Sequence, residues 1–279
     1  CGQAVGDSAG CTTSKAHVFK TTDPKRLALV LNYAETPPNP VAPKNRAVCF
    51  DCEMGYSVRG FELIRVTATS WPAGEELLDV LVQPVGEILD LNSRYSGVWP
   101  EDMVNAEPWS ATKKKKKPDP EPGNPKEGEV ATTRKRMQMV SSPEVARDLL
   151  FSLISPDTPL IGHGLENDLN AMRIVHPTLV DTILLYPHKA GLPIRHGLKA
   201  LMHNLLGRQI QIEAPAGAGA SPRGGHDSAE DARAAGELVR LKVRDEWRVM
   251  KLDGWSLVDG EFVSPRGKTG LLTEKFLET

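Results

Sequence analysis

The chain has 279 residues and a mass of 30.4 kDa, with 40% hydrophobic and 25% charged side chains. This composition is ordinary for a globular protein and excludes a collagen-like chain. The longest apolar runs fall well short of a bilayer span, so we expect no membrane partner. Four cysteines are too few for a disulfide scaffold and no signal-peptide pattern precedes them, which favours a reducing compartment.

The charge is unevenly distributed along the chain. The formal net charge is -2, which does not by itself indicate a nucleic-acid-binding protein. Residues 108–141 hold nine basic and four acidic side chains, so this segment carries +5 and the rest carries -7. An acidic globular remainder often contains clustered carboxylates, and carboxylates that must lie together usually hold a cation.

The first 46 residues read as an irregular N-terminal extension. Residues 1–20 lack apolar periodicity and contain Cys1, Cys11 and His17, for which a Zn²⁺ site and a flexible leader with unrelated cysteines are both open. Residues 25–35 allow a short helix, and the four prolines of residues 36–45 then predict a linker.

A β-rich region follows this linker. Residues 47–54, 61–70 and 77–84 are three apolar runs separated by short turns, which predicts an antiparallel meander. Residues 108–141, with their block of lysines and prolines, are expected to form a disordered basic insertion. A solvated loop is the simpler interpretation of this insertion, and an RNA-binding or nuclear-import element is the alternative.

Helices and short strands are expected to alternate beyond the insertion. Ser142 and Pro143 predict a helix start, with Ser142 as the cap. Further helices are predicted over residues 165–175, over 197–206 and from about 228, and a buried strand over 159–162. Spacings of three and four predict a buried face on the last helix: Ala232, Ala235, Val239, Val243 and Trp247. These elements predict an α/β domain with a mixed sheet over residues 47–250 and a tail over 251–279.

The run Val48–Met54 holds the first candidate site residues. Side chains alternate along a strand, so Asp51 and Glu53 share one face of an otherwise apolar segment. Two neighbouring carboxylates repel each other, and a divalent cation between them would explain the arrangement better than an edge strand with a polar face. The same alternation places Cys49 and Cys52 on opposite faces, which predicts two buried thiols rather than a redox or zinc pair.

Two later segments supply further candidates. Asp168 falls in the first turn of a predicted helix, where the helix dipole alone would favour an acid. Asp231 heads an otherwise apolar helical stripe, and its alternative interpretation is a capping box with Ser228. His226 precedes this helix in a loop. Four carboxylates and a histidine suit two-metal hydrolysis of a phosphodiester, with histidine as the base.

These motifs resemble those of the DEDDh 3′-to-5′ exonucleases, the DnaQ-like branch of the ribonuclease H-like fold. Within that branch the chain is most similar to the eukaryotic Rex-type RNA exonucleases. The resemblance spans about residues 47–245. Its matching stretches are FDCEMGY at 50–56, LIRVTATS at 63–70, YSGV at 95–98, LIGHGLENDLNAMRIVHP at 160–177, DT at 181–182 and HDSAEDA at 226–232.

The resemblance implies a mixed β-sheet flanked by helices and a definite set of site residues. It implies that Asp51, Glu53, Asp168 and Asp231 bind two Mg²⁺ or Mn²⁺ ions. His226 would be the general base that releases 5′-nucleotides from RNA with a free 3′ end, and Met54 would contact the terminal base. The Cys/His segment also looks similar to that of fungal-type members, which favours zinc there.

Two other functions stay open at this stage. One is a catalytically silent scaffold for RNA or protein, which four mutually repelling acids argue against. The other is a DNA-directed 3′-to-5′ exonuclease, because the motifs are common to both branches. Local structural roles are expected for His163 and Asp181. The resemblance and the basic runs favour the nucleus or nucleolus, with the cytoplasm as the alternative, and no particular protein partner is indicated.

Overall fold

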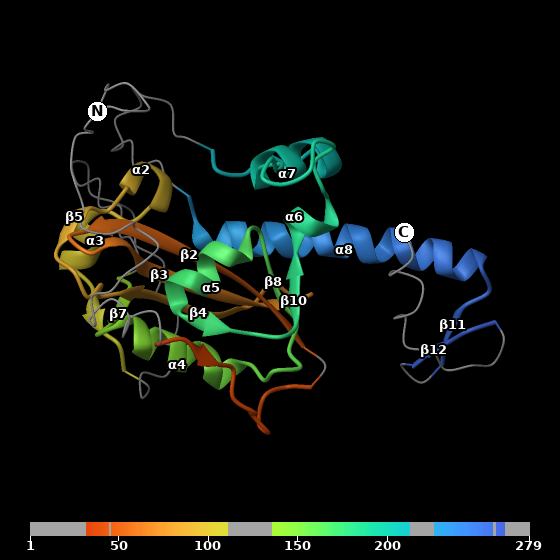
Figure 1. Ribbon diagram of the computed structural model, residues 1–279, viewed down its shortest axis with the longest axis horizontal. Helices are drawn as coiled ribbons and strands as arrows, with labels where there is room; N and C mark the ends of the chain where they lie inside the picture. Colours follow the sequence, from red (N-terminus) through yellow and green to blue (C-terminus); the bar gives the residue numbers. More distant parts are fainter. Residues whose placement is uncertain (1–31, 45, 111–135, 213–225, 259–260, 266–279) are drawn as a thin grey trace, which may run out of the picture.

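The structure is a computed structural model that describes residues 32–44, 46–110, 136–212, 226–258 and 261–265 (Figure 1). Within these residues the main sheet is mixed and has eight strands. Seven follow the order β10-β8-β2-β3-β4-β7-β6, and β5 pairs with β2. Their bounds are β2 Ala47–Ser57, β3 Gly60–Trp71, β4 Glu76–Val82, β5 Ile88–Asp90, β6 Glu107–Pro108, β7 Gln138–Val140, β8 Leu160–Gly162 and β10 Leu179–Asp181.

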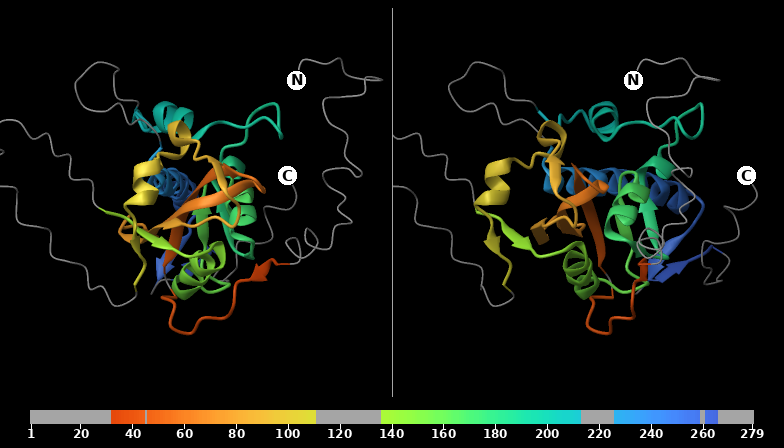
Figure 2. Two further views of the ribbon diagram at one scale, coloured as in Figure 1. Left: turned by 90° about the vertical axis from the view of Figure 1, so that its left-hand side faces the viewer. Right: turned by 60° about the vertical axis from the view of Figure 1, so that its left-hand side comes forward.

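Helices cover both faces of this sheet (Figures 1 and 2). One face packs against α4 and α5 through a cluster that includes Phe50 and Leu150, and the other packs against α8 through Cys49 and Ala235. The helices are α2 Ser93–Ser96, α3 Pro100–Val104, α4 Pro143–Leu153, α5 Leu165–Met172, α6 Thr182–Leu185, α7 Leu198–Leu206 and α8 Ser228–Leu252. This arrangement confirms the predicted α/β fold with a mixed sheet flanked by helices.

The local patterns of the sequence account for the central elements. Strands β2, β3 and β4 form the predicted antiparallel meander. Helix α4 begins as predicted, because the Ser142 hydroxyl accepts a hydrogen bond from the Val145 N–H at 3.4 Å. Cys49 and Cys52 are buried free thiols that belong to core clusters on opposite sides of the sheet, as the alternation predicted.

The expected helix over residues 165–175 is wrong at its end. Helix α5 stops at Met172 because Arg173 adopts a left-handed backbone, and Ile174–Val175 form strand β9. This strand pairs in parallel with β1, Ala34–Glu35, so the helix suggested over residues 25–35 is not present at 34–35.

Part of the predicted linker packs onto the domain. The Thr36 hydroxyl lies 2.9 Å from Nδ1 of His176, whose Nε2 lies 2.7 Å from the Thr158 carbonyl oxygen, and all three residues are buried. Buried polar groups with partners of this kind fix a segment in place. Residues 34–42 are therefore a packed arm of the domain rather than a free linker.

The predicted insertion over residues 108–141 also has structured flanks. Strand β7 pairs in parallel with both β4 and β6, so the two flanks of the insertion close one edge of the sheet. The lysine block falls within residues 111–135, which lie outside the described residues.

Helix α8 continues past the sheet. Val243 is 51% exposed, which corrects the predicted buried face, because the buried positions of α8 end at Val239. Trp247 instead packs edge-on against Phe262 at 5.5 Å, where β11 Ser256–Val258 and β12 Glu261–Val263 form a hairpin within the expected tail. No helix among the described residues is long and apolar enough to cross a membrane.

Candidate active site

Asp168 meets strand β2 where the neighbouring strand ends. Strand β8 pairs with β2 only at Val48 and Cys49, so the Cys52 N–H has no strand partner on that side. This N–H donates a 2.9 Å hydrogen bond to Oδ1 of Asp168. An unpaired strand edge thus binds the carboxylate beside Asp51.

Asp181 fixes the start of the helix that carries Asp168. Its carboxylate accepts hydrogen bonds from the backbone N–H groups of Gly164 and Leu165, at 3.0 and 2.9 Å. It also caps α6 through the Ile183 N–H at 2.9 Å. Gly164 has a positive φ of 76°, which permits the turn from β8 into α5. The capping role expected for Asp181 is therefore present.

The N-terminus of α8 attaches directly to β2. Asp227 is the cap, and its carboxylate accepts a hydrogen bond from the Ala229 N–H at 3.2 Å. The capping box considered for Ser228 and Asp231 is therefore not formed. Ser228 is fully buried instead, and its hydroxyl donates to the Asp51 carbonyl oxygen at 3.1 Å. Because Asp231 follows within the first turn, its side chain lies near the carboxylates of β2.

His226 is held against the turn that follows α2. Its backbone N–H donates to the Tyr95 carbonyl oxygen at 3.0 Å, and the two rings meet edge-on at 6.4 Å. Gly97 has a φ of 63°, and a Cβ there would overlap the His226 carbonyl oxygen. Nδ1 of His226 lies 3.4 Å from Oδ2 of Asp231, and the imidazole is 35% exposed.

The four carboxylates share one electrostatic environment. Burial, followed by repulsion from Asp168 and Asp231, raises the pKa of Asp51 well above its ordinary value. Burial and then the charge of Asp51 do the same to the pKa of Glu53. Burial also raises the pKa of Asp168 to about 7 and the pKa of Asp231 to about 6. Such shifts are typical of acids that a protein keeps together for function rather than stability.

Arg65 lies behind this cluster as a nearly buried cation. It pairs with Glu53 in the register of β2 and β3, and its Nε lies 2.9 Å from Oδ1 of Asp79. Its Nη2 lies 3.3 Å from Oδ1 of Asp227, the cap of α8. The positive charge lowers the pKa of both Glu53 and Asp51, against the dominant effect of burial. Arg65 thereby links β3, β4 and α8 and offsets part of the carboxylate repulsion.

Two carboxylate oxygens in this cluster are buried without a hydrogen-bond partner. They are Oε1 of Glu53 and Oδ1 of Asp231. Unsatisfied buried oxygens call for an explanation, and hard divalent cations prefer carboxylate oxygens as ligands. Among the described residues no three His, Cys, Asp or Glu side chains already converge on a single point. The two partnerless oxygens are the donor type that a hard divalent cation prefers, so the residues present fit such an ion.

The structure describes Met54 but not the predicted zinc ligands. Met54 is partly buried beside the core, directly after the point where the pairing of β2 skips Ile64 of β3. Cys1, Cys11 and His17 lie outside the described residues. His163 has a local role, because its Nδ1 lies 2.8 Å from the Thr182 hydroxyl oxygen.

Sequence reasoning did not find three residues that support the site. Arg65 is the one basic residue of its strand, and pairing β2 with β3 by their turn would have placed it opposite Glu53. Ser228 was considered only as part of an alternative capping box, and its hydrogen bond to the Asp51 carbonyl oxygen was not foreseen. Gln211 donates through its side-chain amide to Oδ2 of Asp231 at 2.9 Å, and no local pattern signals that contact.

Comparison with known proteins shows relatives over most of the chain. No family model matches it. RNA exonuclease 3 of Emericella nidulans is 50% identical over 266 residues, which are 95% of this chain and 39% of that protein. RNA exonuclease 3 of Candida albicans is 31% identical over 252 residues, 88% of this chain and 50% of that protein. The human RNA exonuclease 1 homolog is 32% identical over 246 residues, 88% of this chain and 16% of that protein.

Solved structures share the fold at lower identity. The Neurospora crassa Pan2 catalytic unit, with protease and nuclease domains, matches with a TM-score of 0.53 and 19% identity over 77% of this chain and 30% of its own. A Saccharomyces cerevisiae Pan2 module in complex with AACCAA RNA matches with a TM-score of 0.53 and 19% identity, over 78% and 33% of the two chains.

The fold is of the ribonuclease H-like class, and the chain is similar to the DEDDh-type exonucleases. Within this class the chain is a homologue of the Rex-type RNA exonucleases, as its motifs implied. It spans half or less of the length of the three relatives described above.

Proposed function

We propose that the chain is a metal-dependent 3′-to-5′ exoribonuclease that releases 5′-nucleotides during RNA processing. The observation that carries this proposal is a set of four neighbouring carboxylates from three separate segments, two of which have a buried oxygen without a partner, with His226 in contact with one of them. The similarity to proteins named RNA exonucleases supports RNA as the polymer.

The four carboxylates would hold two Mg²⁺ or Mn²⁺ ions. Asp51 and Glu53 come from β2, Asp168 from α5 and Asp231 from α8. Bound ions of this kind lower the pKa of a water molecule and stabilise the charge on the leaving oxygen. The orphaned oxygens of Glu53 and Asp231 favour these residues as ligands, because a cation would satisfy them.

His226 would accept the proton of the attacking water. Burial and then the charge of Lys199 lower the pKa of His226, so the imidazole is neutral and able to accept a proton at neutral pH. Its partial exposure leaves it accessible to a substrate, and the Tyr95 carbonyl oxygen fixes its backbone. Met54, which directly follows the register shift between β2 and β3, would contact the terminal base of RNA with a free 3′ end.

Linear and circular RNA test this proposal. A 5′-labelled linear RNA, the same RNA closed into a circle and a DNA of the same sequence would be incubated with the chain and Mg²⁺ or Mn²⁺. We expect stepwise shortening of the linear RNA from its 3′ end, release of nucleoside 5′-monophosphates and an intact circle.

Other results would assign another function. Cleavage of the circle would indicate an endonuclease, and equal digestion of the DNA would support the DNA-directed alternative. A folded protein that binds RNA and cleaves no polymer would support the scaffold.

We also propose a nuclear or nucleolar location. The basic runs at residues 113–117 and 134–136 support it, and both include residues outside the described part of the chain. A fusion of the chain to a fluorescent protein should concentrate in the nucleus. Replacing both basic runs with serine should reduce the nuclear share of the fluorescence. Uniform cytoplasmic fluorescence of the unaltered fusion would contradict the proposal.

A further inference from the structure

Gln211 has a strained backbone next to the candidate active site. Its φ is 54°, in the left-handed region that residues other than glycine rarely adopt. Such a conformation is strained, and it persists where the surrounding contacts hold the residue in place. Gln211 lies in the segment that follows α7, and its neighbour Ile210 anchors the segment in the core with 2% exposure.

Three polar groups of Gln211 have partners on α7 and α8. Its backbone N–H donates to Oε2 of Glu230 at 2.9 Å, and its carbonyl oxygen accepts from Nζ of Lys199 at 2.9 Å. Its side-chain Nε2 donates to Oδ2 of Asp231 at 2.9 Å. Glu230 and Asp231 lie in the first turn of α8, whereas Lys199 lies on α7. Gln211 therefore joins α7 to the helix end that carries a proposed metal ligand.

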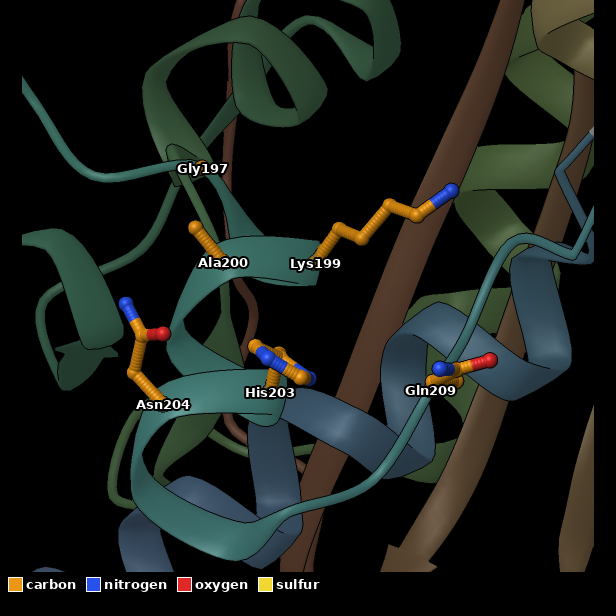
Figure 3. A pocket seen from close by; sticks show the side chains of 6 residues that line it. All are labelled: Gly197, Lys199, Ala200, His203, Asn204 and Gln209. Atoms are coloured by element: carbon orange, nitrogen blue, oxygen red, sulfur yellow. The ribbon is translucent and has the colours of Figure 1, made fainter.

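Lys199, which contacts Gln211, also lines an open cavity. Figure 3 shows Lys199 extending from α7, with Gln209 on the segment that follows the helix. An open cavity of about 610 Å³ lies here, lined by Gly197, Lys199, Ala200, His203, Asn204 and Gln209. Because Gln211 contacts both Lys199 and Asp231, α7 lies close to the candidate active site. The contacts of Gln211 are thus at the border of the site rather than in the core.

The amide of Gln211 makes the two oxygens of Asp231 unequal. Oδ2 accepts the Gln211 hydrogen bond and lies 3.4 Å from Nδ1 of His226. Oδ1 is buried and has no hydrogen-bond partner, and the same holds for Oε1 of Glu53. The hydrogen bond to Gln211 opposes partial rotation about the Cβ–Cγ bond and so fixes the plane in which the two oxygens lie. One oxygen therefore faces Gln211 and His226, and the direction in which the free oxygen points is fixed.

We propose that Gln211 is a positioning residue that acts through Asp231, holding Oδ2 so that Oδ1 is presented to a divalent cation. This inference rests on the proposed function, since the cation is the one that the four carboxylates would share. Hydrogen-bonding partners of this kind orient metal ligands, and removing them typically weakens metal affinity 10- to 100-fold. An amide suits the role because it donates a hydrogen bond without adding another negative charge.

Metal binding in the absence of RNA tests the assignment. Calorimetric titration with Mn²⁺ would compare the unaltered chain with Gln211→Leu, Gln211→Gly and the control Gln209→Leu. Glycine adopts the left-handed backbone without strain and keeps both backbone hydrogen bonds, so Gln211→Gly should fold. Gln209 is exposed on the same segment, so its replacement repeats the chemical change without touching Asp231.

We expect both Gln211 variants to bind Mn²⁺ 10- to 100-fold more weakly, and the control to bind as the unaltered chain does. At saturating Mn²⁺ the KM for RNA should stay unchanged while kcat falls, because the positioning of Asp231 is lost and the RNA contacts are not.

Three results would overturn the assignment. Unchanged Mn²⁺ affinity in Gln211→Gly would mean that the backbone contacts alone matter, and an equal loss in Gln209→Leu would mean that the whole segment does. Absence of Mn²⁺ binding by the unaltered, folded chain would overturn the proposed metal mechanism and this assignment with it.

Discussion

Replacing Asp168 with asparagine should stabilise the metal-free protein. Burial, the largest cause, raises the pKa of Asp168 from 3.8 to about 7. A tenfold change in proton affinity corresponds to about 1.4 kcal/mol, so the ionised carboxylate destabilises the native state by about 4 kcal/mol at pH 8. Asparagine keeps an oxygen acceptor for the Cys52 N–H. Its buried NH₂ group costs about 1 to 3 kcal/mol if it finds no partner, which leaves a net gain of about 2 kcal/mol.

The pH dependence of this gain follows from the direction of the shift. The native carboxyl group holds its proton up to about pH 7, whereas in the unfolded chain it loses the proton near 3.8. The stability that Asp168 contributes is therefore fully present below about pH 4 and is lost as the pH rises through 7. The advantage of Asp168→Asn should grow over that interval and then level off.

Urea unfolding in EDTA, measured from pH 4 to 8.5, gives the comparison. The control is Asp157→Asn, the same change at an exposed position, which should alter the free energy of unfolding by less than about 0.5 kcal/mol. Saturating Mg²⁺ should stabilise the unaltered chain and shrink or reverse the advantage of the variant. A stability difference that does not change with pH would refute the electrostatic reasoning.

Three further predictions concern the support of the site. Gly97→Ala should lower kcat at least tenfold, measured on labelled RNA, because a Cβ would displace the His226 carbonyl; activity within twofold would contradict this. Arg65→Met should destabilise the fold by about 3 to 5 kcal/mol in urea unfolding, because Asp79 loses its buried partner; a loss below 1 kcal/mol would show that the ion pair is dispensable. Lys199→Met should move the acidic limb of the kcat profile to higher pH, since Lys199 lowers the pKa of His226; an unmoved limb would argue against His226 as the base.

Local patterns were sufficient wherever one segment determines its own structure. The alternation in β2 placed Cys49 and Cys52 on opposite faces, and Ser142 with Pro143 located the start of α4. Asp51 and Glu53 stood out because the same alternation left two acids on one face of a buried strand. These inferences needed no knowledge of distant segments.

The predictions that were wrong depended on contacts between distant segments. Ile174–Val175 continue a helical pattern, yet they pair with Ala34–Glu35, which is about 140 residues away in the chain. Val243 continues the apolar stripe of α8 beyond the point where the sheet can cover it. Gln211 acquires its role from α7 and α8 together, so its position in the sequence carries no signal.

Digestion of 5′-labelled RNA by the unaltered chain and by Asp51→Asn tests the central claim most directly. Both proteins would be shown to be folded by circular dichroism and assayed with Mn²⁺ and with EDTA. The account predicts a ladder of RNAs shortened from the 3′ end for the unaltered chain with Mn²⁺, and intact RNA in the other three reactions. The same ladder from Asp51→Asn, or from the unaltered chain in EDTA, would contradict hydrolysis by metal ions held on these carboxylates.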